Sequence, residues 1–143
     1  MNGSNTYKER QSVKNIAEFL FEYYCAEKNY QLIRVGFDEK NKNIDNFFRL
    51  NTFLRNLPDY IVNTNDKTLV VNVKGTANLK EKEYRLIPNF MELYGSKEAQ
   101  LVYAFCFLGE NPKMLYPEKV INLYDQSKDK AWSDGVVYRT LSL

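Results

Sequence analysis

The sequence predicts an α/β domain in which helices flank a central mixed sheet. Its apolar patterns follow one another in the order helix, three strands, helix, strand, an order that packs helices over a sheet. The chain of 143 residues has the length of one domain that buries a core without disulfides. We therefore expect a single domain over residues 1–143, with its core at about 11–108 and a C-terminal extension over 109–143.

Helical periodicity marks three segments. In Gln11–Lys28 the apolar residues recur at steps of three and four, which form one stripe along a helix. Lys80–Tyr94 has the same spacing, but Pro88 interrupts it and predicts either a kink or a helix that begins at that residue. Pro117–Gln126 is the third helix, with proline in its first turn.

Strands are predicted from runs of β-branched and aromatic residues. They are Gln31–Phe37, Leu57–Val62, Thr68–Lys74, Ala99–Leu108 and, as a final edge strand, Val136–Leu141. The run over 99–108 is apolar throughout, as in a strand that is covered on both faces. Asn46–Arg55 is compatible with a strand or with a short helix.

Composition removes several classes of chemistry. Histidine is absent, which excludes Ser–His and Cys–His catalysis and imidazole metal sites. The formal net charge of +2 neither requires nor opposes a nucleic-acid partner. No apolar stretch approaches the roughly 20 residues that cross a bilayer, and Met1–Arg10 is too polar for a signal peptide. We expect no membrane partner and a cytoplasmic location in a bacterial, archaeal or phage-infected cell.

The second and third predicted strands form a hairpin about the turn Asn63–Lys67. With the turn centred between residues 65 and 66, Asp59 lies opposite Asn72, and period-two alternation adds Lys74 to the same face. We expect this polar face to be open to water. The opposite face is predicted to point into the core, with Tyr60, Val62, Val71 and Val73.

An acid, an amide and a lysine on one face permit two interpretations. Oxygen ligands hold a hard cation such as Mg²⁺, and a lysine beside it offsets the charge that develops on a phosphate during hydrolysis. The alternative is a hairpin with three incidental polar residues on a solvent-exposed face. Since histidine is absent, catalysis would have to rest on carboxylates, lysines, tyrosines or a bound cation.

The hairpin resembles the signature of the PD-(D/E)XK nuclease superfamily, in LPDYIV at 57–62 and LVVNVKG at 69–75. It is similar in particular to archaeal and phage Holliday-junction resolvase-like nucleases, over about residues 14–108. The resemblance implies a restriction-endonuclease-like αβββαβ core and a metal-dependent DNA endonuclease that uses Mg²⁺ or Mn²⁺. It implies the catalytic residues Asp59, Asn72, Lys74 and Glu18, and the metal ligands Asp59, Asn72 and Val73.

Position 72 departs from this family pattern, which has an acidic residue where this chain has Asn72. An amide oxygen brings no charge to a cation. The asparagine is an engineered substitution, or it belongs to an active variant whose acid comes from Glu18, Glu81 or Glu83, or it marks a domain that does not cleave. The alternative function is therefore a catalytically inactive nucleic-acid-binding or accessory protein.

Basic residues next to the hairpin are candidates for DNA contacts. Lys80, Lys82 and Arg85 start the helix after Lys74 and could meet phosphates, and Tyr84 could stack on a base or pack at the edge of the core. If the resolvase likeness holds, the DNA is branched and the protein is a homodimer, because symmetric cuts need two sites related by a two-fold axis.

Overall fold

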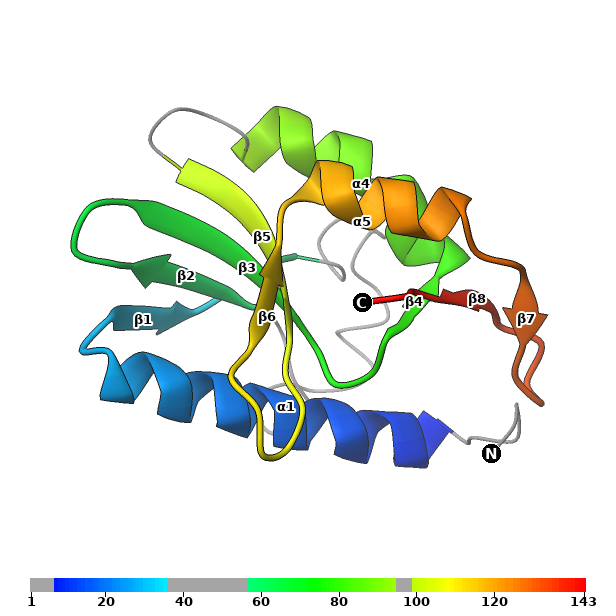
Figure 1. Ribbon diagram of the computed structural model, residues 1–143, viewed down its shortest axis with the longest axis horizontal. Coiled ribbons are helices and arrows are strands. Elements are labelled where there is room, and N and C mark those ends of the chain that lie inside the picture. The colour runs from blue at the N-terminus through cyan, green and yellow to red at the C-terminus, as the bar shows by residue number, and fades with distance from the viewer. Residues whose placement is uncertain (1–6, 36–56, 95–98) are drawn as a thin grey trace, which may run out of the picture.

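A computed structural model describes residues 7–35, 57–94 and 99–143 of the chain. Helices lie on both faces of a five-stranded sheet, with α1 on one face and α4 and α5 on the other (Figure 1). The helices are α1 (Tyr7–Glu27), α4 (Glu81–Tyr94) and α5 (Pro117–Asp125). The strands are β1 (Gln31–Arg34), β2 (Tyr60–Asn63), β3 (Thr68–Lys74), β4 (Asn78–Lys80), β5 (Ala99–Phe105), β6 (Lys113–Leu115), β7 (Lys130–Ala131) and β8 (Val137–Thr140).

The main sheet is mixed, as predicted. Its strand order is β1-β2-β3-β5-β6, in which β3 and β5 are parallel and the other neighbours antiparallel. The β2–β3 hairpin has the predicted register, with Tyr60 opposite Val71 and Val62 opposite Leu69. Over the described residues, the predicted αβββαβ order is confirmed, with the short β4 added between β3 and α4.

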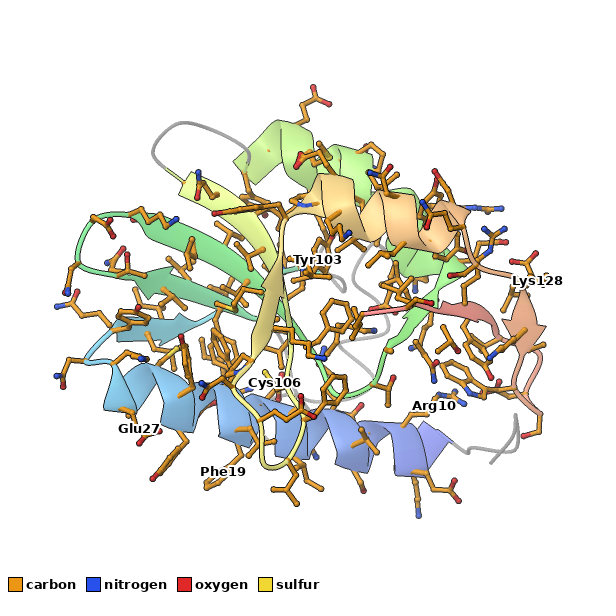
Figure 2. The ribbon with its side chains drawn as sticks, in the orientation of Figure 1. Arg10, Phe19, Glu27, Tyr103, Cys106 and Lys128 are labelled. Atoms are coloured by element: carbon orange, nitrogen blue, oxygen red, sulfur yellow. The ribbon has the colours of Figure 1, made fainter. Side chains whose placement is uncertain are left out.

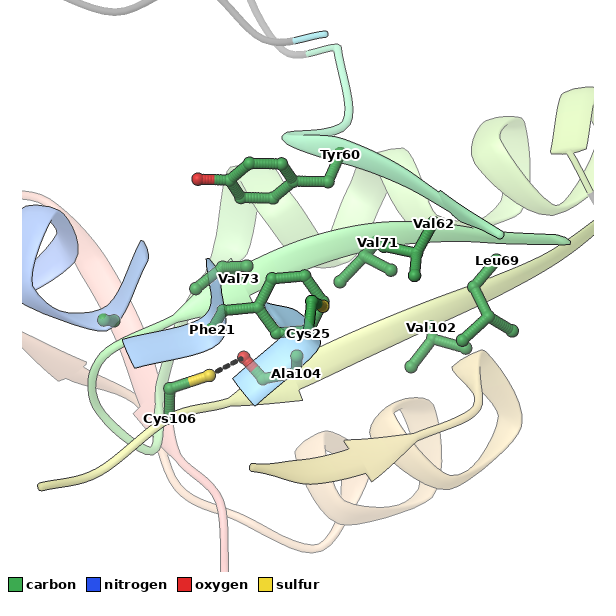
Figure 3. Packing of buried hydrophobic residues seen from close by; sticks show 11 residues of the cluster. Phe21, Cys25, Tyr60, Val62, Leu69, Val71, Val73, Val102, Ala104 and Cys106 are labelled. Atoms are coloured by element: carbon green, nitrogen blue, oxygen red, sulfur yellow. Dashed lines mark hydrogen bonds between the residues drawn. The ribbon is translucent and has the colours of Figure 1, made fainter. Parts of the chain in front are cut away.

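Helix α1 covers the face of the sheet that was predicted to be the core face. Its residues Phe21 and Cys25 are buried against valines of β2, β3 and β5 (Figure 3). The end of β3 lies very close to the helix: a Cβ atom on Gly75 would stand 2.7 Å from the carbonyl oxygen of Val13. Because only glycine leaves room for this approach, Gly75 fixes the distance between the first half of α1 and the hairpin.

The other face of β3 lies inside the molecule, which corrects the prediction that it opens to water. Ile87 and Phe90 of α4 and Val120 of α5 form a second core over that face together with Val70 of β3. Lys74 follows on the same face, and its side chain is only 15% exposed. Pattern alone suggested a solvent face because Asn72 and Lys74 are polar, but two amphipathic helices cover it.

The C-terminal segment forms a second sheet with β4, in the order β4-β8-β7. β8 is the middle strand of this sheet, so the prediction of an edge strand there is wrong. Pro88 lies inside α4, which begins at Glu81, so of the two predicted alternatives a helix that begins at the proline is excluded. Burial of its neighbours Ile87 and Phe90 outweighs the hydrogen bond that proline removes.

Two further predictions concern the segment 46–55 and the absence of a membrane-spanning helix. The segment Asn46–Arg55 lies outside the described residues. Within the described ranges, no helix has the length and apolar character that a bilayer crossing requires.

Candidate functional site

Asp59 stands directly before β2 and is held by four hydrogen-bonding or ionic contacts. Its backbone N–H donates to the carbonyl of Val71 at 3.0 Å, and its carbonyl accepts from Val35 at 2.9 Å. One carboxylate oxygen, Oδ2, accepts from the backbone N–H of Val73 at 2.8 Å. The other, Oδ1, lies 3.2 Å from Nζ of Lys14 on α1. Asp59 is 9% exposed, and both its carboxylate oxygens have partners.

Lys14 is the cation that three carboxylates share. Burial alone would lower its pKa, but the charges of Asp59, Glu18 and Glu83 raise it above the ordinary lysine value. The acids of α1, the hairpin and α4 thus stabilise the charged form of Lys14.

Glu18, the predicted helical acid, is buried close to Asp59. Burial raises its pKa, and the Asp59 charge raises it further. Its carboxylate lies 3.5 Å from the guanidinium of Arg34 on β1, which also reaches Glu22 at 2.8 Å. The Tyr60 hydroxyl also donates to Glu22. Glu18 and Glu22 therefore share an ionic network that continues from Asp59 along α1.

Lys74 points to α4 and pairs with Glu83. Its Nζ lies 2.7 Å from both carboxylate oxygens of Glu83, which also accepts from the backbone N–H of Lys80 at 3.0 Å. Burial alone would raise the pKa of Glu83, but Lys74 and Lys80 hold it at about 2. Of the three acids considered as replacements for the missing acid at position 72, Glu83 is the one in contact with Lys74.

Asn72 lies on β3, two residues before Lys74. It joins neither the ionic group of Asp59 and Lys14 nor that of Lys74 and Glu83 among the described residues. It is opposite Tyr103 of β5 in the parallel pair, and Figure 2 labels that tyrosine on the side of the sheet near α4 and α5. Its Nδ2 is buried and has no hydrogen-bond partner among the described residues. Because this nitrogen is enclosed by protein, no ion reaches it in this arrangement.

A cleft joins the two ionic groups and is lined by α1, the end of β3, β4 and the C-terminal segment. We call it the basic cleft, because its charged lining residues are Arg10, Lys14, Lys74, Lys80 and Glu83. Arg10 lies at the start of α1 (Figure 2). It covers the ring of Trp132 at 4.2 Å and bonds to Asp134 at 2.6 Å. The sequence interpretation had included Lys74 and Lys80 but had missed Arg10 and Lys14.

The other predicted DNA contacts lie away from this cleft. Lys82 is exposed on α4, and Arg85 pairs with Glu81 at 2.9 Å on the same helix. The Tyr84 ring stacks on Tyr124 at 4.0 Å, and its hydroxyl donates to Asp125 at 2.8 Å. Tyr84 therefore joins α4 to α5, which is the core-edge alternative considered for it.

The described residues do not fit a bound Mg²⁺ or Mn²⁺ ion in this arrangement. None of their His, Cys, Asp and Glu side chains form a group of three that could hold a metal. The carboxylate of Asp59 is already shared between an ammonium and a backbone N–H. Asn72 adds no charge, and a hard divalent cation depends on charged oxygen ligands.

Comparison with known proteins supports the fold. No protein-family model and no curated protein sequence matches the chain. Among solved structures, it is similar to the Holliday junction resolvase Hjc of the archaeal hyperthermophile Archaeoglobus fulgidus, with a TM-score of 0.51 and 12% sequence identity. The match covers 88% of this chain and 87% of that one. The central sheet and its flanking helices thus have a restriction-endonuclease-like arrangement.

Proposed function

We propose that this chain is a DNA-binding protein with a nuclease-like fold, and that its basic cleft holds a phosphate of the DNA backbone. The observation that carries the proposal is the convergence of Arg10, Lys14, Lys74 and Lys80 on one cleft, from helix, hairpin and β4. Lysine and arginine contacts to phosphate supply most of the affinity of proteins for DNA. The similarity in fold to a Holliday junction resolvase supports DNA, including branched DNA, as the partner.

Crowding of like charges is the physical reason why the cleft favours an anion. Burial lowers the pKa of Lys80, and the charges of Lys74, Arg10 and Lys14 lower it further. Glu83 compensates part of this positive charge. A phosphate in the cleft adds negative charge beside these ammonium groups, which stabilises their charged forms, and it offers acceptors to their N–H donors.

A second candidate function is the metal-dependent DNA endonuclease that the sequence predicts. Two observations favour it: Asp59 and Lys74 lie at the same end of the β2–β3 hairpin, and Glu83 places a further carboxylate on Lys74. The endonuclease requires Lys14 to leave Asp59 so that a cation can enter. The homodimer, with two cutting sites related by a two-fold axis, belongs to this candidate.

One set of experiments separates the two functions. Fluorescence anisotropy with labelled duplex and four-way-junction DNA measures binding, and gel assays with Mg²⁺ or Mn²⁺ measure cleavage by this chain and by Asn72→Asp. We expect both proteins to bind DNA and neither to cut it. Strong cleavage by Asn72→Asp would establish the endonuclease instead, and absence of binding to either DNA would refute both candidates.

Oligomeric state is measured on the same samples. Sedimentation velocity with and without four-way-junction DNA shows whether two copies assemble. A dimer in complex with the junction favours the resolvase-like candidate, and a monomer on duplex DNA favours the simple binding function.

A further inference from the structure

We propose that the ammonium of Lys14 takes the place of the divalent cation in this nuclease-like site, so that the basic cleft binds phosphate groups without a metal. The inference rests on the proposed DNA-binding function and specifies how the site is charged. It explains two features together: an asparagine where the family pattern has an acid, and a lysine in contact with Asp59.

The formal charges of the two arrangements are equal. A divalent ion between two carboxylates gives a neutral group, and so do one carboxylate, one amide and one ammonium. In this chain Asp59 and Lys14 form the ion pair, with the ammonium 3.2 Å from the carboxylate, and Asn72 adds no charge. Loss of one negative charge at position 72 is thus matched by a cation that the chain itself carries.

The position of Lys14 is fixed by the packing of α1 against the end of β3. The lysine belongs to the turn of α1 that begins with Val13, and the carbonyl of Val13 approaches Gly75 so closely that no side chain fits between them. This contact sets the helix against the end of β3, next to the Val73 N–H that orients Asp59. The lysine side chain is 43% exposed and lines the basic cleft.

The inference also limits what the site can do to its ligand. A divalent metal ion lowers the pKa of bound water and creates a nucleophile, which an ammonium ion cannot do by coordination. Lys14 can attract and hold a phosphate beside Lys74 and Lys80. We therefore expect the bound phosphodiester to stay intact.

Metal titration in the absence of DNA tests the inference directly. Binding of Mn²⁺ is followed by electron paramagnetic resonance for the wild type, Lys14→Gln, Asn72→Asp and the double variant. Lys8→Gln, an exposed lysine on the same helix, is the matched control. We expect no saturable Mn²⁺ site in the wild type and the control. In the double variant we expect a saturable site that binds Mn²⁺ at least tenfold more tightly than the wild type does.

Two results of this titration would overturn the inference. One is a wild-type site for Mn²⁺ as tight as that of the double variant. The other is a double variant that keeps its circular dichroism spectrum but gains no affinity for Mn²⁺.

DNA binding with and without metal provides a separate measurement. At matched ionic strength, we expect equal affinity in EDTA and in Mg²⁺ for the wild type, and a several-fold loss for Lys14→Gln in EDTA. If the wild type binds DNA only with Mg²⁺, the role of Lys14 is refuted and the DNA-binding function stands. If DNA does not bind under any condition, the function is refuted, and the Mn²⁺ titration still decides the charge of the site.

Discussion

The two ionic groups at the end of the hairpin have opposite balances of charge. On the side of α1, the carboxylates Asp59, Glu18 and Glu22 share the cations Lys14 and Arg34. On the side of α4, the single carboxylate Glu83 lies between Lys74 and Lys80. The pKa of Glu18 is accordingly raised, by burial and by Asp59, whereas that of Glu83 is held at about 2.

This difference assigns separate roles to the two sides. In the proposed function, the acidic side holds Lys14 in the basic cleft, and the basic side supplies further cations for a phosphate. Replacement of an acid on the acidic side should mainly alter stability and metal affinity. Replacement of a lysine on the basic side should mainly alter affinity for DNA.

We expect the largest effect on stability from a substitution that pushes α1 away from the hairpin. Gly75→Val places a side chain where even a Cβ atom would stand 2.7 Å from the Val13 carbonyl oxygen, so α1 must move away from β3. We expect the free energy of unfolding to fall by about 3 kcal/mol. Urea denaturation measures it, with Gly75→Ala as an intermediate case. Wild-type stability of Gly75→Val would show that the helix does not press on the hairpin here.

Removal of the acid on the basic side should lower stability and raise DNA affinity together. Glu83→Gln deletes the partner of Lys74 and Lys80, and we expect a loss on the order of 2–3 kcal/mol at neutral pH. The same change removes a negative charge from the basic cleft, so binding to DNA should tighten. Denaturation and anisotropy measure the two effects. Weaker DNA binding by this folded variant would contradict the role of the cleft.

The stabilisation by Glu83 should have a defined pH dependence. Its pKa is lowered from 4.5 to about 2 in the folded chain, so its contribution is fully present above about pH 4.5 and is lost as pH falls toward 2. The stability difference between the wild type and Glu83→Gln should therefore be constant near neutrality and shrink in acid. A difference that grows on acidification would contradict the ion pairs.

A substitution on the acidic side should affect stability more than DNA binding. Asp59→Asn keeps an acceptor for the Val73 N–H but loses the charge that holds Lys14. We expect a loss of about 1–2 kcal/mol in unfolding free energy, with DNA affinity unchanged or slightly higher. Denaturant titration and anisotropy check both values. A tenfold loss of DNA affinity without unfolding would give Asp59 a direct role in the ligand site.

We expect the smallest effect in a comparison of DNA affinity between variants of two lysines from one short segment. Lys80 lines the basic cleft, whereas Lys82 is exposed on α4 and does not. We expect Lys80→Met to weaken DNA binding about threefold and to reduce the salt dependence by about one phosphate contact. Lys82→Met should change the affinity less. Equal losses for both variants would indicate diffuse attraction by the whole surface.

The parts of the fold that depend on nearby residues were predictable from sequence. The turn over 63–67 and the alternation of the flanking strands are sufficient to place Tyr60 opposite Val71, and the structure confirms this register. The second sheet was not predictable, because β4 has three residues and pairs with β8, whose Thr140 lies 62 residues after Asn78. Short strands with distant partners leave no periodic signal.

The candidate site was predictable in part for the same reason. Asp59 and Lys74 follow from the hairpin, whereas Lys14 and Arg10 reach the cleft only through the docking of α1 on Gly75. A signal for them was present, because residues 10, 14, 18 and 22 are each four apart and form one row along the helix. The row begins with two cations, Arg10 and Lys14, which line the cleft. It ends with two acids, Glu18 and Glu22, which pair with Arg34.

In the proposed function, the cations of the basic cleft hold DNA phosphates. The most direct test of this role is the affinity for a labelled duplex in EDTA, measured at several salt concentrations for the wild type and for a variant with Lys14, Lys74 and Lys80 each changed to Gln. We expect at least a hundredfold weaker binding by the variant and a salt slope smaller by about three. Equal affinity and slope in a folded variant would contradict the claim.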